Sequence, residues 1–117
     1  MSGSSSFDLN HPDLVSVLDE LPLWSAPFGL KLLSMVRLRR GIAALDIGCG
    51  TGFPLLELAG RLGNTCHVTG LDPWEAAIAR IRMKIRTTGI GSVAVVTGTA
   101  ESMPFADASF DLVVSNN

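Results

Sequence analysis

Apolar residues along the chain recur with two different periods. In some stretches they return every three or four residues, which is typical of one face of an amphipathic helix. In others they form short, nearly continuous runs that end at glycine, aspartate or asparagine, which is typical of strands buried on both faces. The pattern predicts helices over residues 10–22, 26–40, 54–63 and 73–89, and strands over 42–48, 66–72, 92–98 and 110–116.

The boundaries of the second predicted helix carry the expected end signals. Ser25 is placed to cap its N-terminus, and Gly41 is placed to end it. Its last turn would hold Arg37, Arg39 and Arg40, which suits the negative end of a helix dipole.

From residue 42 onward, strands alternate with helices through short connections, and this predicts a parallel sheet in an α/β fold. Right-handed crossovers would give the strand order 3-2-1-4. The order reverses between strands 1 and 4, and open sheets of this kind bind ligands at such a point, beyond the carboxyl ends of the strands. We therefore divide the chain into a disordered tail (1–9), N-terminal helices (10–41) and an α/β domain (42–117).

Charge and composition narrow the possible partners. The chain has 117 residues and a formal net charge of −2, and no run of five like charges occurs, so nothing indicates nucleic-acid or anionic-membrane binding. The sequence also lacks an apolar stretch of about 20 residues and the features of a signal peptide. Cys49 and Cys66 form no CxxC pair and have no histidine at zinc-ligand spacing. We expect a cytoplasmic protein with reduced thiols and no metal.

The stretch "LDIGCGTGFP" (45–54) is the clearest candidate for a ligand site. Three glycines, Gly48, Gly50 and Gly52, directly follow a predicted strand and allow main chain to approach a ligand closely. The dinucleotide pattern GxGxxG would need glycine where Phe53 stands. Asp46, just before the glycines, would repel a pyrophosphate. These residues favour a small ligand that carries a positive group and no phosphate.

Three segments together resemble the class I S-adenosylmethionine-dependent methyltransferases. "LDIGCGTGFPLLELA" resembles their first motif, "GLDPW" the second, and "GTAESMPFADASFDLVVSN" the segment that leads through the adenine loop into strand 4. "ELPLWSAPFGLKLL" is similar, less specifically, to helices that many members place over the cofactor. The resemblance implies a Rossmann-like sheet, truncated relative to the full seven-stranded fold, with the N-terminal helices (10–41) as a cofactor lid.

The resemblance also implies which residues contact S-adenosylmethionine. Asp46 would face the methionine ammonium, and Asp72 would accept the ribose hydroxyls. The full implied set is Asp46, Gly48, Cys49, Gly50, Thr51, Gly52, Asp72, Pro73, Trp74, Thr99, Ala100, Glu101 and Ser115. Two alternatives stay open, because Asp72 and Glu75 also form a helix capping box and Trp74 also suits a core position.

Some positions depart from the family pattern or carry structural roles. Thr99 stands where the family commonly has an aspartate that accepts from the adenine amino group. Turn formation and strand entry are favoured for Asp107 and Asp111. No residue is assigned as a catalytic base.

The leading hypothesis is a methyltransferase, or its cofactor-binding N-terminal portion, acting on a small-molecule acceptor. The alternatives are an NAD-dependent oxidoreductase and a non-catalytic fragment that self-associates. The strand at 110–116 would be an exposed apolar edge. We therefore expect either a longer enzyme or a homo-oligomer formed through that edge.

Overall fold

The computed structural model describes residues 10–20, 26–37 and 39–115, and it contains each predicted helix and strand. The elements in chain order are α1 (Pro12–Glu20), α2 (Ala26–Met35), β1 (Ala43–Ile47), α3 (Leu55–Leu62), β2 (His67–Asp72), α4 (Glu75–Thr88), β3 (Val93–Thr97), the short 3₁₀ helix η1 (Ala100–Ser102) and β4 (Leu112–Ser115). The predicted cap Ser25 lies outside the described residues.

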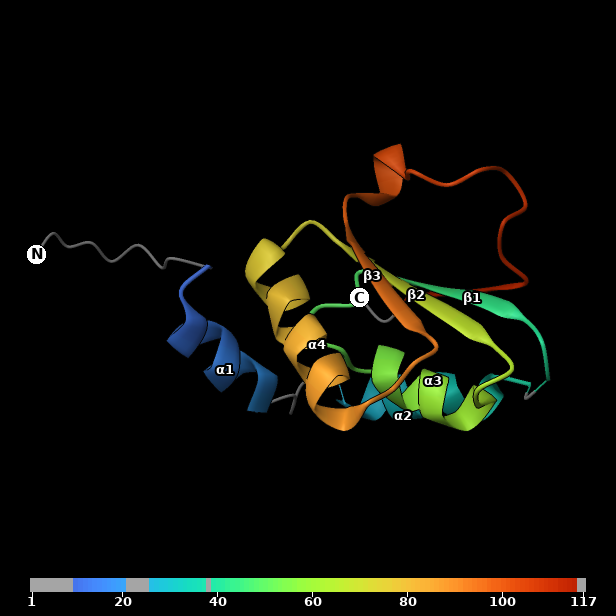
Figure 1. Ribbon diagram of the computed structural model, residues 1–117, viewed down its shortest axis with the longest axis horizontal. Helices are drawn as coiled ribbons and strands as arrows, with labels where there is room; N and C mark the ends of the chain where they lie inside the picture. The colour runs from blue at the N-terminus through green and yellow to red at the C-terminus, as the bar shows by residue number, and fades with distance from the viewer. Residues whose placement is uncertain (1–9, 21–25, 38, 116–117) are drawn as a thin grey trace, which may run out of the picture.

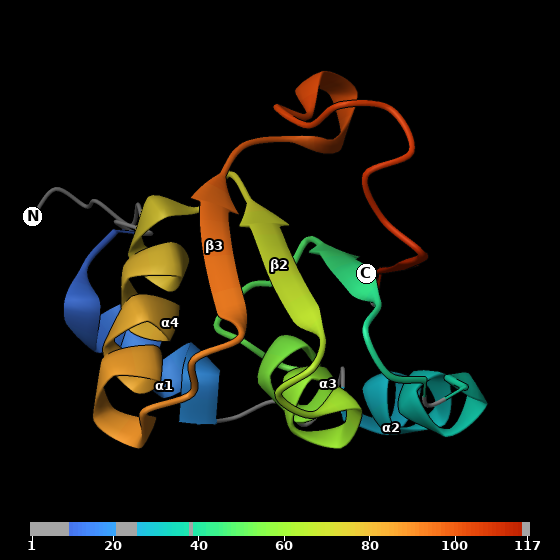
Figure 2. The ribbon, with the colours of Figure 1, turned by 45° about the vertical axis from the view of Figure 1, so that its right-hand side comes forward.

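The four strands form one parallel sheet in the order β3-β2-β1-β4, which confirms the predicted order. Ala44 of β1 lies opposite Val68 of β2 on one side and Leu112 of β4 on the other. Because all strands run the same way, their carboxyl ends lie at one edge. Figure 2 shows the chain after β3 arching beyond that edge.

The main core lies between the sheet and the helices, which occupy one side of it in Figure 1. Ala44, Val68 and Val114 on this face are buried together with Leu58 of α3 and Ile81 of α4. The apolar spacing along α3 and α4 is what directs them to this face. The crossover β1-α3-β2-α4-β3 thus places both helices against the same side of the sheet.

The opposite face of the sheet is closed at its centre and open at its margins. Leu45 and Leu71 are buried there, and Gly98 lies against Leu71, since a Cβ on Gly98 would come within 3.0 Å of the Leu71 side chain. Val113 of the edge strand β4 remains 54% exposed. The centre of this face is therefore covered, and its margin at β4 is exposed.

The second helix is shorter than predicted. It ends at Met35, and the Val36 N–H donates to the Leu33 carbonyl, which tightens the last turn. Arg37, Arg39 and Arg40 therefore follow the helix instead of forming its last turn, and that prediction was wrong. Gly41 has a φ of +70° and belongs to the turn into β1.

Candidate cofactor site

The carboxyl edge of the sheet brings the predicted site residues together. The glycine turn, residues 48–52, follows β1, while Asp72 ends β2. Thr99 lies two residues after β3, and Ser115 ends β4 beside Ile47. Segments that are distant in sequence thus meet at one edge, as expected for a ligand site in a parallel sheet.

The glycine turn is fixed by hydrogen bonds within the protein. The amides of Gly48 and Cys49 both donate to the Leu71 carbonyl, at 2.7 and 3.1 Å, and the Gly52 amide donates to the Cys49 carbonyl. Gly50 adopts a φ of +54°, and a Cβ there would meet nothing within 4 Å. The turn therefore needs glycine for its backbone conformation and leaves open space over Gly50.

Asp46 is a buried carboxyl group near the carboxyl end of β1. It is fully enclosed, and among the described residues neither carboxyl oxygen finds a donor. Burial raises its pKa from 3.8 to about 7, and the nearby Asp72 carboxylate adds to this rise. A buried carboxylate is unfavourable unless a positive charge lies nearby. Of all the features of the site, the buried Asp46 carboxyl therefore best fits a cationic ligand.

Asp72 fixes the turn and the start of α4 at once. One carboxylate oxygen accepts from the Gly50 amide at 2.9 Å, and the other accepts from the Trp74 amide at 2.8 Å. The bond reaches Trp74, two residues on, so the geometry is a local turn and not the capping box with Glu75, the alternative left open by the sequence. A carboxylate has about four acceptor positions, so Asp72 can still accept from a ligand hydroxyl.

The remaining predicted contacts surround this edge. Thr99 precedes η1, and Thr99, Ala100, Glu101, Pro73 and Ser115 are exposed there. Trp74 is half-buried. Asp111 has the structural role favoured for it, because its carboxylate and amide bond the Ala43 amide and carbonyl.

Neither cysteine belongs to reactive machinery. Burial, with the charges of Asp46 and Asp72, raises the pKa of the Cys49 thiol far above its ordinary value, so the thiol stays protonated. The Cys66 thiol is also buried and donates to backbone carbonyls. Within the described part of the chain, no cluster of histidine, cysteine and acidic side chains could hold a metal.

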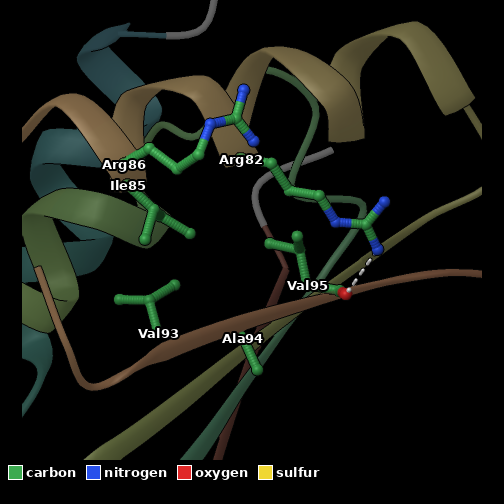
Figure 3. Close-up of a pocket in the computed structure, with 6 residues that line it drawn as sticks. All are labelled: Arg82, Ile85, Arg86, Val93, Ala94 and Val95. Carbon is green, nitrogen blue, oxygen red and sulfur yellow. Dashed lines mark hydrogen bonds between the residues drawn. The ribbon is translucent and has the colours of Figure 1, made fainter.

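A separate groove lies between α4 and the edge strand β3, away from the glycine turn. Figure 3 shows Arg82 extended along it, and the guanidinium Nη2 donates to the Val95 carbonyl at 3.3 Å. This carbonyl belongs to β3, the edge strand of the sheet, and Arg82 is thereby fixed along it. None of the predicted cofactor residues lines this groove.

Sequence reasoning missed a polar cluster behind the glycine turn. Lys84 donates to the Thr51 carbonyl and to Asp19 of α1, and Arg80 donates to the same aspartate. The helical spacing of Arg80 and Lys84 showed only that they share a face of α4. Their partner lies more than sixty residues away, and nothing local in the sequence indicates it.

Comparison with known proteins agrees with this geometry. Residues 44–117 match the family model described as a methyltransferase domain. The chain is 35% identical over 81 residues to a demethylmenaquinone methyltransferase of Listeria welshimeri, covering 69% of this chain and 34% of that protein. It is 33% identical over 90 residues to nocamycin O-methyltransferase of Saccharothrix syringae, covering 77% and 32%.

A solved structure extends the likeness to the fold. The crystal structure of a SAM-dependent methyltransferase from Aquifex aeolicus superposes with a TM-score of 0.74 at 25% identity, covering 94% of this chain and 57% of that one. The chain belongs to the methyltransferase domain family. Membership confirms the predicted methyltransferase family and, at family level, the predicted fold and S-adenosylmethionine as the cofactor.

The length of the match and the character of the helices bear on the remaining predictions. The chain spans about a third of the length of the curated relatives it matches. In the described residues, no helix has the length and apolar character needed to span a bilayer.

Proposed function

We propose that this chain binds S-adenosylmethionine at the carboxyl edge of the sheet, between the glycine turn and the end of β2, and serves methyl transfer to a small-molecule acceptor. The observation that carries the proposal is the buried Asp46 carboxyl, which has no hydrogen-bond partner in the described part of the chain and lies behind a turn with open space at Gly50. A phosphate ligand would be repelled here. A cation would remove the unfavourable interaction.

The chain's residues would act by binding and orienting. Asp46 would favour the methionine ammonium through its charge, acting directly or through water, and Asp72 would accept the ribose hydroxyls with its remaining acceptor positions. Thr99, Ala100 and Glu101 would border the adenine, with Trp74 beside them. The bound cofactor supplies an activated methyl group, so the protein's contribution is position and electrostatics.

The small-molecule acceptor is supported by the relatives' names. Demethylmenaquinone and nocamycin, after which two of the relatives are named, are both small compounds. We assign no residue of this chain as a catalytic base. Self-association through β4 is a further proposal, supported by its place at the sheet edge and the exposure of Val113.

Isothermal titration with S-adenosylhomocysteine tests the proposal. Asp72→Asn keeps one acceptor oxygen for the turn and removes the charge and the second acceptor, so we expect its affinity to fall at least about tenfold. Asp107→Asn is the matched control, because Asp107 is an exposed aspartate in the loop before β4. Absence of binding by the wild-type chain, or equal affinity in the two variants, would refute this assignment. Self-association without binding would favour the non-catalytic alternative.

A further inference from the structure

A partly buried polar cluster joins the N-terminal helix α1 to the back of the glycine turn. Asp19 of α1 is only 11% exposed, and its two carboxylate oxygens accept from Lys84 Nζ at 2.6 Å and Arg80 Nε at 2.9 Å. The same Lys84 ammonium donates to the Thr51 carbonyl at 2.7 Å. One lysine therefore bonds both the helix α1 and the main chain of the turn.

The bonds in this cluster are of the strong, charge-assisted kind. Burial raises the pKa of Asp19, but hydrogen bonds from Lys84, Arg80 and Thr51 outweigh it, so the pKa lies below its ordinary value and the group stays ionised. Lys84 and Arg80 are each about one-quarter exposed. Because these side chains are partly buried, solvent screens them less than it screens a fully exposed ion pair.

The position of Thr51 gives the cluster a functional consequence. Thr51 lies between Gly50 and Gly52, and Gly50 is held from its other side by Asp72. Removing the bond from Lys84 to the Thr51 carbonyl would release the turn on that side, while the bond to Asp72 would still hold the other side.

The helix α1 is attached to α4 at two separate places. At the far end of α1, Asn10 accepts from the Ala76 amide. Figure 1 shows α1 beside α4.

We propose that Lys84 is a positioning residue for the glycine turn, and that α1 takes part through Asp19, so that docking of α1 and binding of the cofactor favour each other. The coupling between α1 and the cofactor rests on the proposed function. Coupling of this kind is reciprocal: if α1 strengthens binding at the turn, ligand at the turn must stabilise α1 to the same extent.

The first test needs no ligand. Amide hydrogen exchange in residues 48–52 should become faster in Lys84→Met and in Asp19→Asn, and Lys84→Arg should restore most of the protection. Arg86→Met is the matched control, since it removes a cation from an exposed position of the same helix. Unchanged exchange of the turn in both test variants would overturn the proposal, whether or not the chain binds cofactor.

The second test measures the coupling. S-adenosylhomocysteine should slow amide exchange in residues 12–20 of the wild-type chain, and Lys84→Met should raise its Kd about fivefold or more while Arg86→Met does not. Bound ligand that leaves α1 exchange unchanged would refute the coupling.

If Lys84→Met fails to fold, Asp19→Asn and the wild-type exchange experiment still decide the question. A wild-type chain that binds no ligand refutes the proposed function and the coupling, and leaves the first test to decide the role of Lys84.

Discussion

Replacing Asp46 with asparagine should stabilise the ligand-free chain at neutral and alkaline pH. The side chain is fully buried on β1, and among the described residues its oxygens have no donor. Asparagine has nearly the same shape and cannot ionise. The substitution therefore isolates the cost of placing a negative charge at this position.

The magnitude follows from the two pKa values. The Asp46 pKa is about 7 in the folded chain, against an ordinary value of 3.8. Since each pKa unit corresponds to 1.36 kcal/mol, the separation amounts to about 4 kcal/mol. The unfolded chain loses this proton near pH 4 and the folded chain keeps it until about pH 7. The folded chain binds more protons in that window, so its free energy of unfolding falls as the pH rises.

Urea unfolding followed by circular dichroism between pH 4.5 and 8.5 measures this effect. Other carboxylates titrate in both proteins, so the quantity of interest is the difference between wild type and Asp46→Asn. We expect that difference to grow in favour of the variant up to about 4 kcal/mol at pH 8. The same variant should bind S-adenosylhomocysteine more weakly at pH 8, where the wild-type carboxylate is charged. Parallel pH profiles of the two proteins would refute the reasoning.

Substitutions of three glycines separate backbone conformation, packing and ligand access. Gly50→Ala should cost about 1–2 kcal/mol of stability because its φ is +54°, and it should lower S-adenosylhomocysteine affinity more than tenfold in calorimetry because the new methyl enters the open space. Gly70→Ala should lower the unfolding free energy by about 1–3 kcal/mol, because its Cβ would lie 2.7 Å from Leu55 and 2.9 Å from Cys49. Gly60→Ala in α3, where a Cβ meets nothing, is the control and should add about 0.5–1 kcal/mol. A Gly70→Ala protein as stable as Gly60→Ala would contradict the packing argument.

The sheet was predictable because its determinants are local. Each strand carries a short, largely apolar run, interrupted in β2 by threonine and glycine, and each helix has a three-to-four-residue period. The handedness of the crossovers then favours the observed strand order. The end of α2 was not predictable in the same way. Arg37, Arg39 and Arg40 fit a helix end by charge alone, but the chain leaves the helix at Met35 to enter the turn at Gly41.

The candidate site was predictable in its position and not in its bonding. Asp46, Asp72 and the glycines stand at strand ends, so the parallel sheet brings them together whatever the side chains do. The bond from Gly50 to Asp72 joins residues that are 22 positions apart, and the bond from Lys84 to Asp19 joins residues 65 apart. Such contacts depend on how α1 and α4 pack, which no short sequence motif records.

The bonding of the turn explains why this glycine turn suits a cation although glycine turns often bind phosphate. A phosphate-binding turn points its amides at the ligand, with a positive helix end behind them. Here the amides of Gly48 and Cys49 are used by the Leu71 carbonyl, and the amide of Gly50 is used by Asp72. The Lys84 ammonium also touches the turn, at the Thr51 carbonyl, but it is paired with the Asp19 carboxylate. Among the described residues, the Asp46 carboxyl has no such partner. On the proposed function, the glycines would provide access and the two acids would provide selectivity for a ligand with a positive group and no phosphate.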